Sequence, residues 1–207
     1  NEKMTADQRL ALFETLLHSR ENRIEHNEIY RTMLRLGDGN GIYLSAMGEN
    51  NQLVRNYLHD IDATMIRTDN EATFTVMAEN VFARGSMQTF KGPGEFRDNI
   101  GIDLKGIGPA RPKMTSTRNV FVMDKAKSGV NKIFGQWEDC ILYTTSPLKD
   151  VTPGQELATD EQREKGKAGL IYADPQFDPA VMEKKIFRFL PGSPCEKLGI
   201  KPLDMSQ

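Results

Sequence analysis

Apolar residues in the first half of the chain recur at the three- and four-residue spacing of amphipathic helices. The clearest run covers residues 50–67, where Leu53, Leu58, Ile61 and Met65 fall on one predicted helix face. Weaker runs of the same kind predict helices over residues 5–17, 23–36, 71–78 and 95–100. We therefore expect the amino-terminal part of the protein to be helical.

The spacing of apolar residues changes after residue 80, and from there it predicts extended segments instead of helices. Residues 81–90 are predicted to be extended, and residues 115–124 and 130–145 to form two long strands joined by a polar turn over 125–129. Short strand segments are expected again at 171–172 and 185–190. Helices followed by antiparallel strands indicate an α+β fold with helices packed on a curved sheet.

Glycine, proline and charged residues interrupt these elements. Residues 101–113 are predicted to be an irregular loop, and the polar segment 146–169 a long insertion of the kind that often closes over a ligand. Residues 191–207 form a proline-containing tail, and the pattern shows no internal repeat. We expect one domain over residues 1–207, with a helical amino-terminal extension over 1–50.

Composition narrows the possible partners. Lysine and arginine total 27 against 29 acidic residues, a balance that argues against nucleic acid. No apolar run is long enough for a membrane span, and the first residues contain no apolar signal core. The two cysteines and three histidines show no metal-ligand spacing. We expect a cytoplasmic protein without a metal or an organic cofactor.

Three segments carry a resemblance to a known family. They read NQLVRNYLHDIDATMIRTDNEATFTVMAENVF, GSMQTFKGPGEFRDNI and NVFVMDKAKSGVNKIFGQWEDCILYTT. Their order and spacing over residues 51–145 resemble the SnoaL-like branch of the NTF2-like superfamily. The resemblance implies a cone-shaped curved antiparallel sheet wrapped around helices, with a pocket inside, and association into homodimers or homotrimers. Relatives of this kind include dehydratases, isomerases, polyketide cyclases, cofactorless lyases and purely binding domains, so the fold alone does not decide function.

Asp62 is the leading catalytic candidate. It lies within the apolar stripe formed by Leu58 and Met65, and a partly desolvated carboxylate suits proton transfer. The alternative is an ordinary ion-paired residue, with Arg55 or Arg67 as its partner at the rim of the helix.

Tyr57 and His59 complete the candidate catalytic set. The family places a tyrosine five residues before the aspartate, which implies that Tyr57 donates a proton to a substrate oxygen; it could equally be a core residue. His59 is a candidate because histidine is a common acid-base residue, although its helical neighbours are polar, which favours a solvated or interface position.

Six further residues are candidates for substrate binding: Arg97, Thr115, Arg118, Asn119, Trp137 and Tyr143. Thr115 stands where dehydratases of the family carry a pocket histidine, so a standard dehydratase mechanism is in doubt. Arg97 and Arg118 could stabilise an oxyanion or lie at the surface. Trp137 and Tyr143 could stack on an aromatic ligand or pack in a core or interface.

The resemblance favours a cofactor-independent lyase that acts by acid-base elimination on a small aromatic or polycyclic alcohol. Lyases of lignin catabolism that release formaldehyde from diarylpropane diols are one example. A dehydratase, a ketosteroid-isomerase-like isomerase, a polyketide cyclase and a non-catalytic ligand-binding domain are the alternatives.

Overall fold

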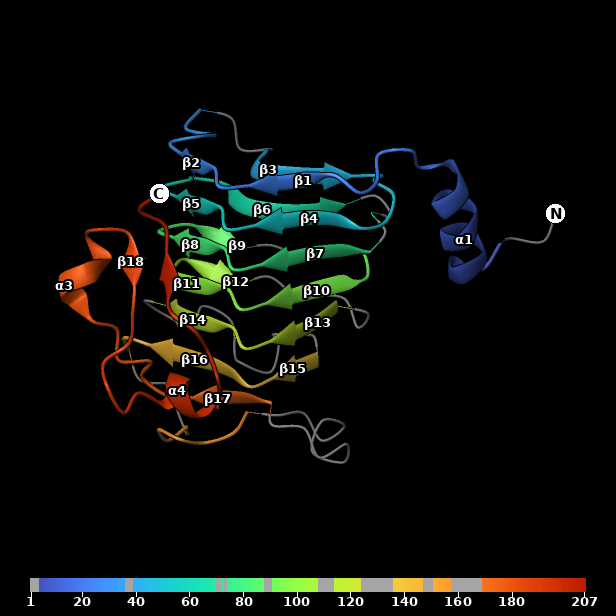
Figure 1. The fold of residues 1–207 in the computed structure, drawn as a ribbon. Helices are drawn as coiled ribbons and strands as arrows, with labels where there is room; N and C mark the ends of the chain where they lie inside the picture. Colours follow the sequence, from blue (N-terminus) through green and yellow to red (C-terminus); the bar gives the residue numbers. More distant parts are fainter. Residues whose placement is uncertain are drawn as a thin grey trace.

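Short parallel strands, not helices, make up most of the chain. The computed structural model describes residues 4–35, 39–69, 72, 74–87, 91–107, 114–123, 136–146, 151–157 and 169–207. Over these residues the backbone winds through successive coils, each of which stacks on the one before it (Figure 1). The fold is a parallel β-solenoid.

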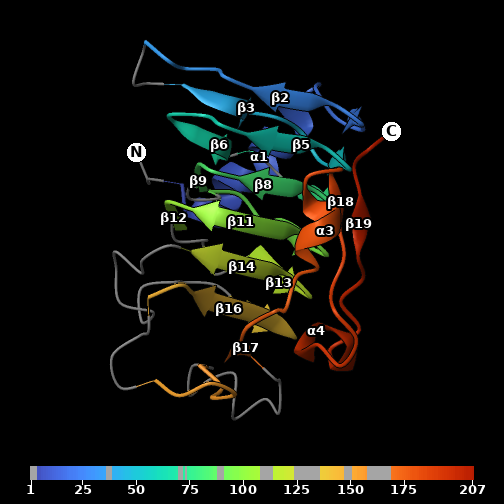
Figure 2. The same ribbon diagram turned by 90° about the vertical axis from the view of Figure 1, so that its left-hand side faces the viewer.

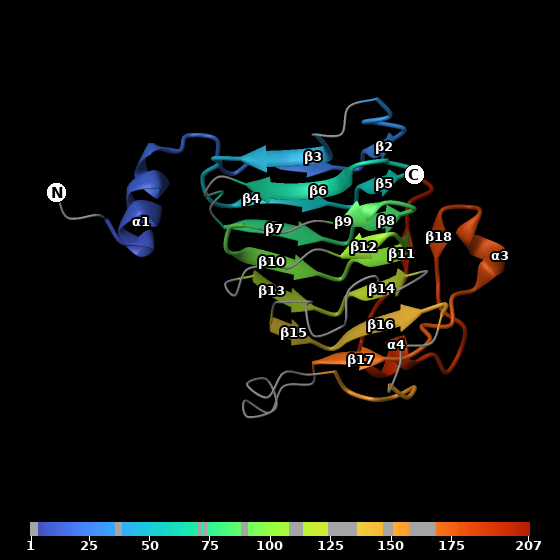
Figure 3. The same cartoon turned by 180° about the vertical axis from the view of Figure 1, so that it is seen from behind.

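Three parallel sheets form the sides of the solenoid, and we name them A, B and C. Sheet A contains β1 (Arg23–Glu25), β4 (Asn51–Val54), β7 (Thr75–Ala78), β10 (Gly94–Arg97), β13 (Met114–Thr117) and β15 (Gln136–Glu138). Sheet B contains β2 (Glu28–Tyr30), β5 (Tyr57–His59), β8 (Val81–Ala83), β11 (Ile100–Leu104), β14 (Val120–Met123), β16 (Cys140–Thr144) and β17 (Leu170–Tyr172). Sheet C, seen from behind in Figure 3, contains β3 (Asn40–Ser45), β6 (Thr64–Asp69), β9 (Ser86–Met87) and β12 (Gly106–Ile107).

A repeated two-residue turn joins sheet A to sheet B. Its first residue has a positive φ, as in Arg55 (55°) and Asp98 (57°). Its second residue is a buried asparagine in the second to fifth coils, at positions 56, 80, 99 and 119. One residue in the left-handed region turns the chain sharply, and the asparagine then directs its amide into the solenoid.

The solenoid interior is filled by residues that occupy the same place in successive coils. In sheet A, Leu53 is paired with Met77, and Met77 with Phe96. The ring of Phe96 stacks between Phe82 and Phe121, with ring centroids 6.0 and 6.2 Å apart. All five side chains are almost completely buried, so they supply a large part of the hydrophobic stabilisation.

The outer face of sheet B is also apolar, and the C-terminal segment 173–207 covers it. This segment contains α3 (Pro179–Met182), β18 (Ile186–Phe187), α4 (Pro194–Lys197) and β19 (Leu203–Asp204). Phe187 and Leu203 pack with Val81, Ile100 and Val120 in a second hydrophobic cluster. Figures 1 and 2 show the segment running along the stack from the last coil back to the first ones.

The predicted α+β, NTF2-like cone is wrong, and with it the resemblance to the SnoaL-like branch. The run over residues 50–67 is not a helix but three strands. Leu53 lies in β4 of sheet A, Leu58 in β5 of sheet B and Met65 in β6 of sheet C. All three are fully buried, so the apolar pattern was identified correctly but assigned to the wrong element.

The other predicted elements had mixed outcomes. The first predicted helix is confirmed as α1 (Ala6–Leu16), whereas the described parts of 23–36, 71–78 and 95–100 form short strands and turns instead of the expected helices. The expected hairpin is wrong because its two halves pair in parallel, β13 with β15 and β14 with β16. Its turn over 125–129 and most of the insertion 146–169 lie outside the described residues.

Candidate functional site

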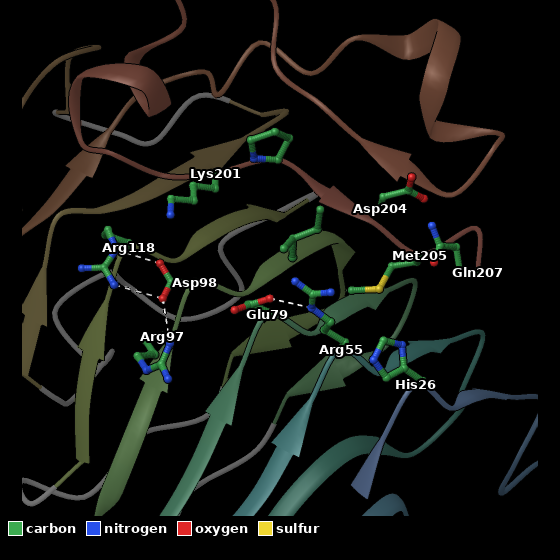
Figure 4. A pocket seen from close by; sticks show the side chains of 12 residues that line it. His26, Arg55, Glu79, Arg97, Asp98, Arg118, Lys201, Asp204, Met205 and Gln207 are labelled. Carbon is green, nitrogen blue, oxygen red and sulfur yellow. Dashed lines mark hydrogen bonds and ion pairs between the residues drawn. The ribbon is translucent and has the colours of Figure 1, made fainter.

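A groove lies between the turns that join sheets A and B and the C-terminal segment. It encloses about 680 Å³. Its floor is formed by turn residues of successive coils, and its roof by the last residues of the chain (Figure 4). The residues that line it are His26, Arg55, Glu79, Arg97, Asp98, Arg118, Lys201, Pro202, Leu203, Asp204, Met205 and Gln207.

Opposite charges on neighbouring coils pair along the groove floor. The Arg55 Nε lies 2.7 Å from a Glu79 carboxylate oxygen, and Arg118 donates to both oxygens of Asp98 at 2.7 and 3.0 Å. Arg97 donates to the same carboxylate at 3.2 Å. The hydrogen bond to Asp98 raises the pKa of Arg118. Two arginines thus hold one carboxylate, and the guanidinium groups remain partly exposed to the groove.

The turn geometry brings these side chains into line. His26, Arg55, Glu79, Asp98 and Arg118 all occupy the positive-φ position that precedes the asparagine. Neighbouring strands in a sheet lie about 4.8 Å apart. Five coils therefore set these groups along a line of roughly 19 Å, parallel to the solenoid axis.

A smaller cavity of about 190 Å³ shares five lining residues with the groove. The shared residues are His26, Arg55, Asp204, Met205 and Gln207. The smaller cavity adds Glu28, Tyr57 and Lys185, so it adjoins the groove at the first coils.

The structure brings two of the predicted catalytic residues together at this end. His59 stacks with both Tyr57 and Tyr30, with ring centroids 4.3 and 5.1 Å away. Its Nδ1 lies 2.7 Å from Asp60, and its Nε2 lies 3.1 Å from Glu28. Both imidazole nitrogens therefore have a carboxylate partner, and the ring contacts two tyrosines.

The two carboxylates of this cluster are also held by cations. Arg84 donates to both oxygens of Asp60, at 2.6 and 2.7 Å, and together with His59 it lowers the pKa of Asp60 well below 3.8. Lys185 from the C-terminal segment binds Glu28 at 2.8 Å and, with His59, lowers the pKa of Glu28 below 4.5. The cluster is a charged network linking the first coils to the C-terminal segment.

Asp62 lies outside the groove, and its ion pair is not part of the charged network around His59. Its side chain is 62% exposed, and the Asp62 Oδ1 lies 3.6 Å from the Lys105 ammonium nitrogen. It borders an open hollow of about 540 Å³ on the turns that follow sheet B, together with Asp60 and Arg84. The desolvation on which its predicted role depended does not occur, and its cation partner is a lysine instead of the arginine considered.

The six predicted substrate-binding residues separate into three groups. Arg97 and Arg118 meet in the groove. Asn119 and Trp137 are buried structural residues: Asn119 belongs to the asparagine turn, and Trp137 meets Phe121 edge-on at 5.5 Å. Thr115 lies exposed on sheet A, and Tyr143 lies half-buried on the outer face of sheet B near Tyr172.

Sequence reasoning missed Arg55, Glu79 and Asp98 as groove residues. A usable signal was present, because a charged residue precedes asparagine in the phrases RN, EN, DN and RN at residues 55–56, 79–80, 98–99 and 118–119. This two-residue pattern marks the turn between sheets A and B in successive coils, and so it identifies the charged residues that lie in line along the solenoid.

The described residues contain no group of three or more histidine, cysteine or acidic side chains placed to hold a metal ion. Both cysteines are buried in the described structure, and desolvation raises the pKa of each thiol to about 12. They stay protonated near neutral pH and are poor nucleophiles. Among the described helices, none is long and apolar enough to cross a membrane.

Comparisons of the chain with protein-family models, with curated proteins and with solved structures give no match. Functional inference therefore rests on the groove and its residues.

Proposed function

We propose that the chain binds an extended acidic oligosaccharide along the groove. The observation that carries this proposal is the line of paired guanidinium and carboxylate groups, repeated at the spacing of the coils beneath the C-terminal segment. An elongated ligand with a short repeat suits such a line, because each coil offers it a charged or polar side chain at the equivalent place.

The chemistry of the groove fits a ligand that carries both hydroxyl and acidic groups. Arg55, Arg97, Arg118 and Lys201 are cations, whereas Glu79, Asp98 and Asp204 are anions. Guanidinium groups bind carboxylates or sulfates through two parallel hydrogen bonds, and carboxylates accept hydrogen bonds from sugar hydroxyls. The slight excess of cations favours an acidic over a neutral glycan.

Lys201 is well placed to distinguish acidic ligands from neutral ones. It reaches the groove from the C-terminal segment, opposite the Arg118–Asp98 pair (Figure 4). The described residues provide no ion-pair partner for its ammonium group, in contrast to Arg55 and Arg118. An acidic group of the ligand would give Lys201 a partner, so its contribution to binding should depend strongly on ligand charge.

The predicted cofactor-independent lyase activity on a small aromatic alcohol stays a prediction. The three cavities described above are lined mainly by charged and polar residues, which suits a hydrophilic polymer better than a polycyclic alcohol.

Isothermal titration with oligouronates of increasing length tests the proposal. We expect affinity to rise with length until the groove is filled, to fall with added salt, and to be lost when the carboxylates are methyl-esterified. Arg118→Ala and Lys201→Ala should each weaken binding about tenfold, the effect of losing one charge-assisted hydrogen bond.

Arg188→Ala is the matched control, because Arg188 lies in the same C-terminal segment, is 56% exposed and pairs with Asp178 at 3.2 Å outside the groove. Its affinity should equal that of the parent protein. An equal loss of affinity in Arg188→Ala would refute the proposal, and so would the absence of binding by any oligouronate.

A further inference from the structure

The first coil leaves the amino-terminal end of the solenoid open. β1, β2 and β3 each stand at the outer edge of their sheet, and no described residue pairs with those edges. Helix α1 precedes this coil but lies beside the stack and does not cover it, as Figures 1 and 3 show from opposite sides. Open strand edges are templates for pairing with another chain.

Backbone groups of β1 face this open edge. Asn22 accepts from the Gln52 N–H, and His26 donates to the Val54 carbonyl, so even-numbered residues face β4. Because the direction alternates along a strand, the N–H and C=O groups of Arg23 and Glu25 face away from β4. The Glu25 carbonyl already accepts from the Asn27 side chain at 2.9 Å and retains a second lone pair.

The turn asparagines are also incomplete at this end. The side-chain oxygen of Asn56 accepts from both nitrogens of Asn27, at 3.2 and 2.9 Å. The described residues provide no such donor for the side-chain oxygen of Asn27 itself. Ile24 and Ile29 are only half-buried, although their counterparts in the next coil, Leu53 and Leu58, are fully buried.

At the opposite end of the solenoid, the chain covers the last strand of sheet B. Residues 154–157 run antiparallel to β17, with hydrogen bonds from Gly154 N–H to Tyr172 O at 2.7 Å and from Tyr172 N–H to Gln155 O at 2.9 Å. In a head-to-tail stack, β2 of one copy would meet this covered edge, so sheet B could not continue from copy to copy, although β15 and β12 end sheets A and C without a described strand partner. Pairing of amino-terminal end against amino-terminal end avoids the covered edge and gives a closed two-fold arrangement.

We propose that two copies of this chain join through β1, antiparallel and with the two-fold axis at Ile24. This register places Arg23 opposite the Glu25 of the other copy, and Glu25 opposite its Arg23. The same register aligns the outward-facing backbone groups of these residues as hydrogen-bonded pairs and brings the two Ile24 side chains together.

Charge complementarity selects a second copy over an unrelated strand. Arg23 and Glu25 are 53% and 39% exposed, and within one chain they pair with each other. Antiparallel pairing offers each of them an opposite charge across the strands as well. The sequence Arg-Ile-Glu is thus complementary to itself about its centre.

Sedimentation equilibrium of the 207-residue chain and of charge variants tests this interface. We expect a reversible dimer for the parent protein. Arg23→Glu should weaken it about tenfold or more, because four like charges then face each other across the strands. The swap Arg23→Glu with Glu25→Arg restores opposite charges and should return the dissociation constant to within about threefold of the parent value.

Two further variants separate pairing from folding. Glu25→Pro removes an N–H that faces away from β4, so it should abolish the dimer while the circular dichroism spectrum stays unchanged. Arg188→Glu, a charge reversal far from β1, should leave the dimer intact. The proposal is overturned if the parent protein is a monomer at 200 µM, which is roughly the concentration at which a weak specific interface is occupied. A dimer that is insensitive to Arg23→Glu would also overturn it.

Discussion

The turn asparagines hold successive coils together through their side-chain amides. Asn56 donates from its backbone to the side-chain oxygen of Asn80 at 3.0 Å, Asn80 donates to Asn99 at 2.9 Å, and Asn99 donates to Asn119 at 2.9 Å. In the sixth coil the place is taken by Cys140, whose sulfur accepts from the Asn119 N–H at 3.3 Å. Each amide thereby satisfies buried backbone groups that the sharp turn leaves without a strand partner.

Asn80→Ala is expected to destabilise the fold by about 3 kcal/mol, because it leaves the buried N–H of Asn56 unpaired and removes one hydrogen bond from the buried carbonyl of Leu53. Urea unfolding measures this change in free energy. Asn27→Ala removes the exposed first member of the row and should cost about 1 kcal/mol or less. Equal losses in the two variants would show that burial of the amide row does not matter.

The His59 cluster predicts a specific response to acid. The folded-state pKa values of Asp60 and Glu28 lie below their ordinary values of 3.8 and 4.5. Their stabilisation is therefore complete above those ordinary values and is lost as the pH falls toward the folded-state values. Both groups are about 40% exposed, so solvent screening limits the effect to about 1 kcal/mol.

We expect Asp60→Asn to be less stable than the parent protein at pH 7 and to show a shallower loss of stability between about pH 5 and pH 2. Urea midpoints across this range provide the measurement. Asp62→Asn, a neighbouring exposed carboxylate with a looser lysine partner, is the control and should follow the parent curve.

The C-terminal segment is the element that creates the groove. It packs against the apolar outer face of sheet B through Phe187 and Leu203, and its Lys185 forms an ion pair with Glu28 in the first coil. The floor of the groove belongs to the solenoid and the roof to this segment. Loosening the segment should therefore weaken ligand binding without changing the floor.

Phe187→Ala tests this coupling. Phe187 is 3% exposed and lies 5.7 Å from the Tyr57 ring, so its removal should destabilise the protein by about 3 kcal/mol and weaken oligouronate binding. Leu190→Ala, at a 42% exposed position in the same segment, should change stability by less than about 0.5 kcal/mol. Thermal melts and titrations on both variants measure the effects, and unchanged binding by Phe187→Ala would contradict the coupling.

Particular elements explain why the sequence predicted the core residues but not the fold. The strands hold only a few residues each, and the two-residue turn with its positive φ interrupts the alternation of a strand. Leu58, Ile61 and Met65 are all internal and stand three and four residues apart, so their spacing resembles that of a helix. Tyr57 and His59 were both predicted to lie on a helix, but they are neighbours in the structure because they share one face of a strand.

The groove could have been predicted only in part. The charged residue before each turn asparagine repeats visibly, but successive coils differ in length, as the sheet A partners Arg23, Gln52, Val76, Glu95 and Thr115 show. This irregular spacing hides the repeat from a search at fixed period. The roof could not be foreseen, because it depends on residues 201–207 crossing several coils.

The whole molecule should behave spectroscopically as a β protein. The longest described helix is α1, with 11 residues, and nearly all other described regular structure is extended. The far-ultraviolet circular dichroism spectrum should therefore show a single minimum near that of β-sheet and only a weak helical contribution (about 10% helix or less, below the average for globular proteins). A strong helical double minimum would refute the solenoid.

The architecture as a whole presents one long polar face whose groups repeat with the coils, and this face is the basis of the proposed function. The most direct test is a crystal structure of the protein with an acidic oligouronate. We predict that the sugar chain lies parallel to the solenoid axis, with its carboxylates on Arg118 and Lys201 and its hydroxyls on Glu79. A ligand found elsewhere, or an empty groove at saturating ligand concentration, would contradict the account.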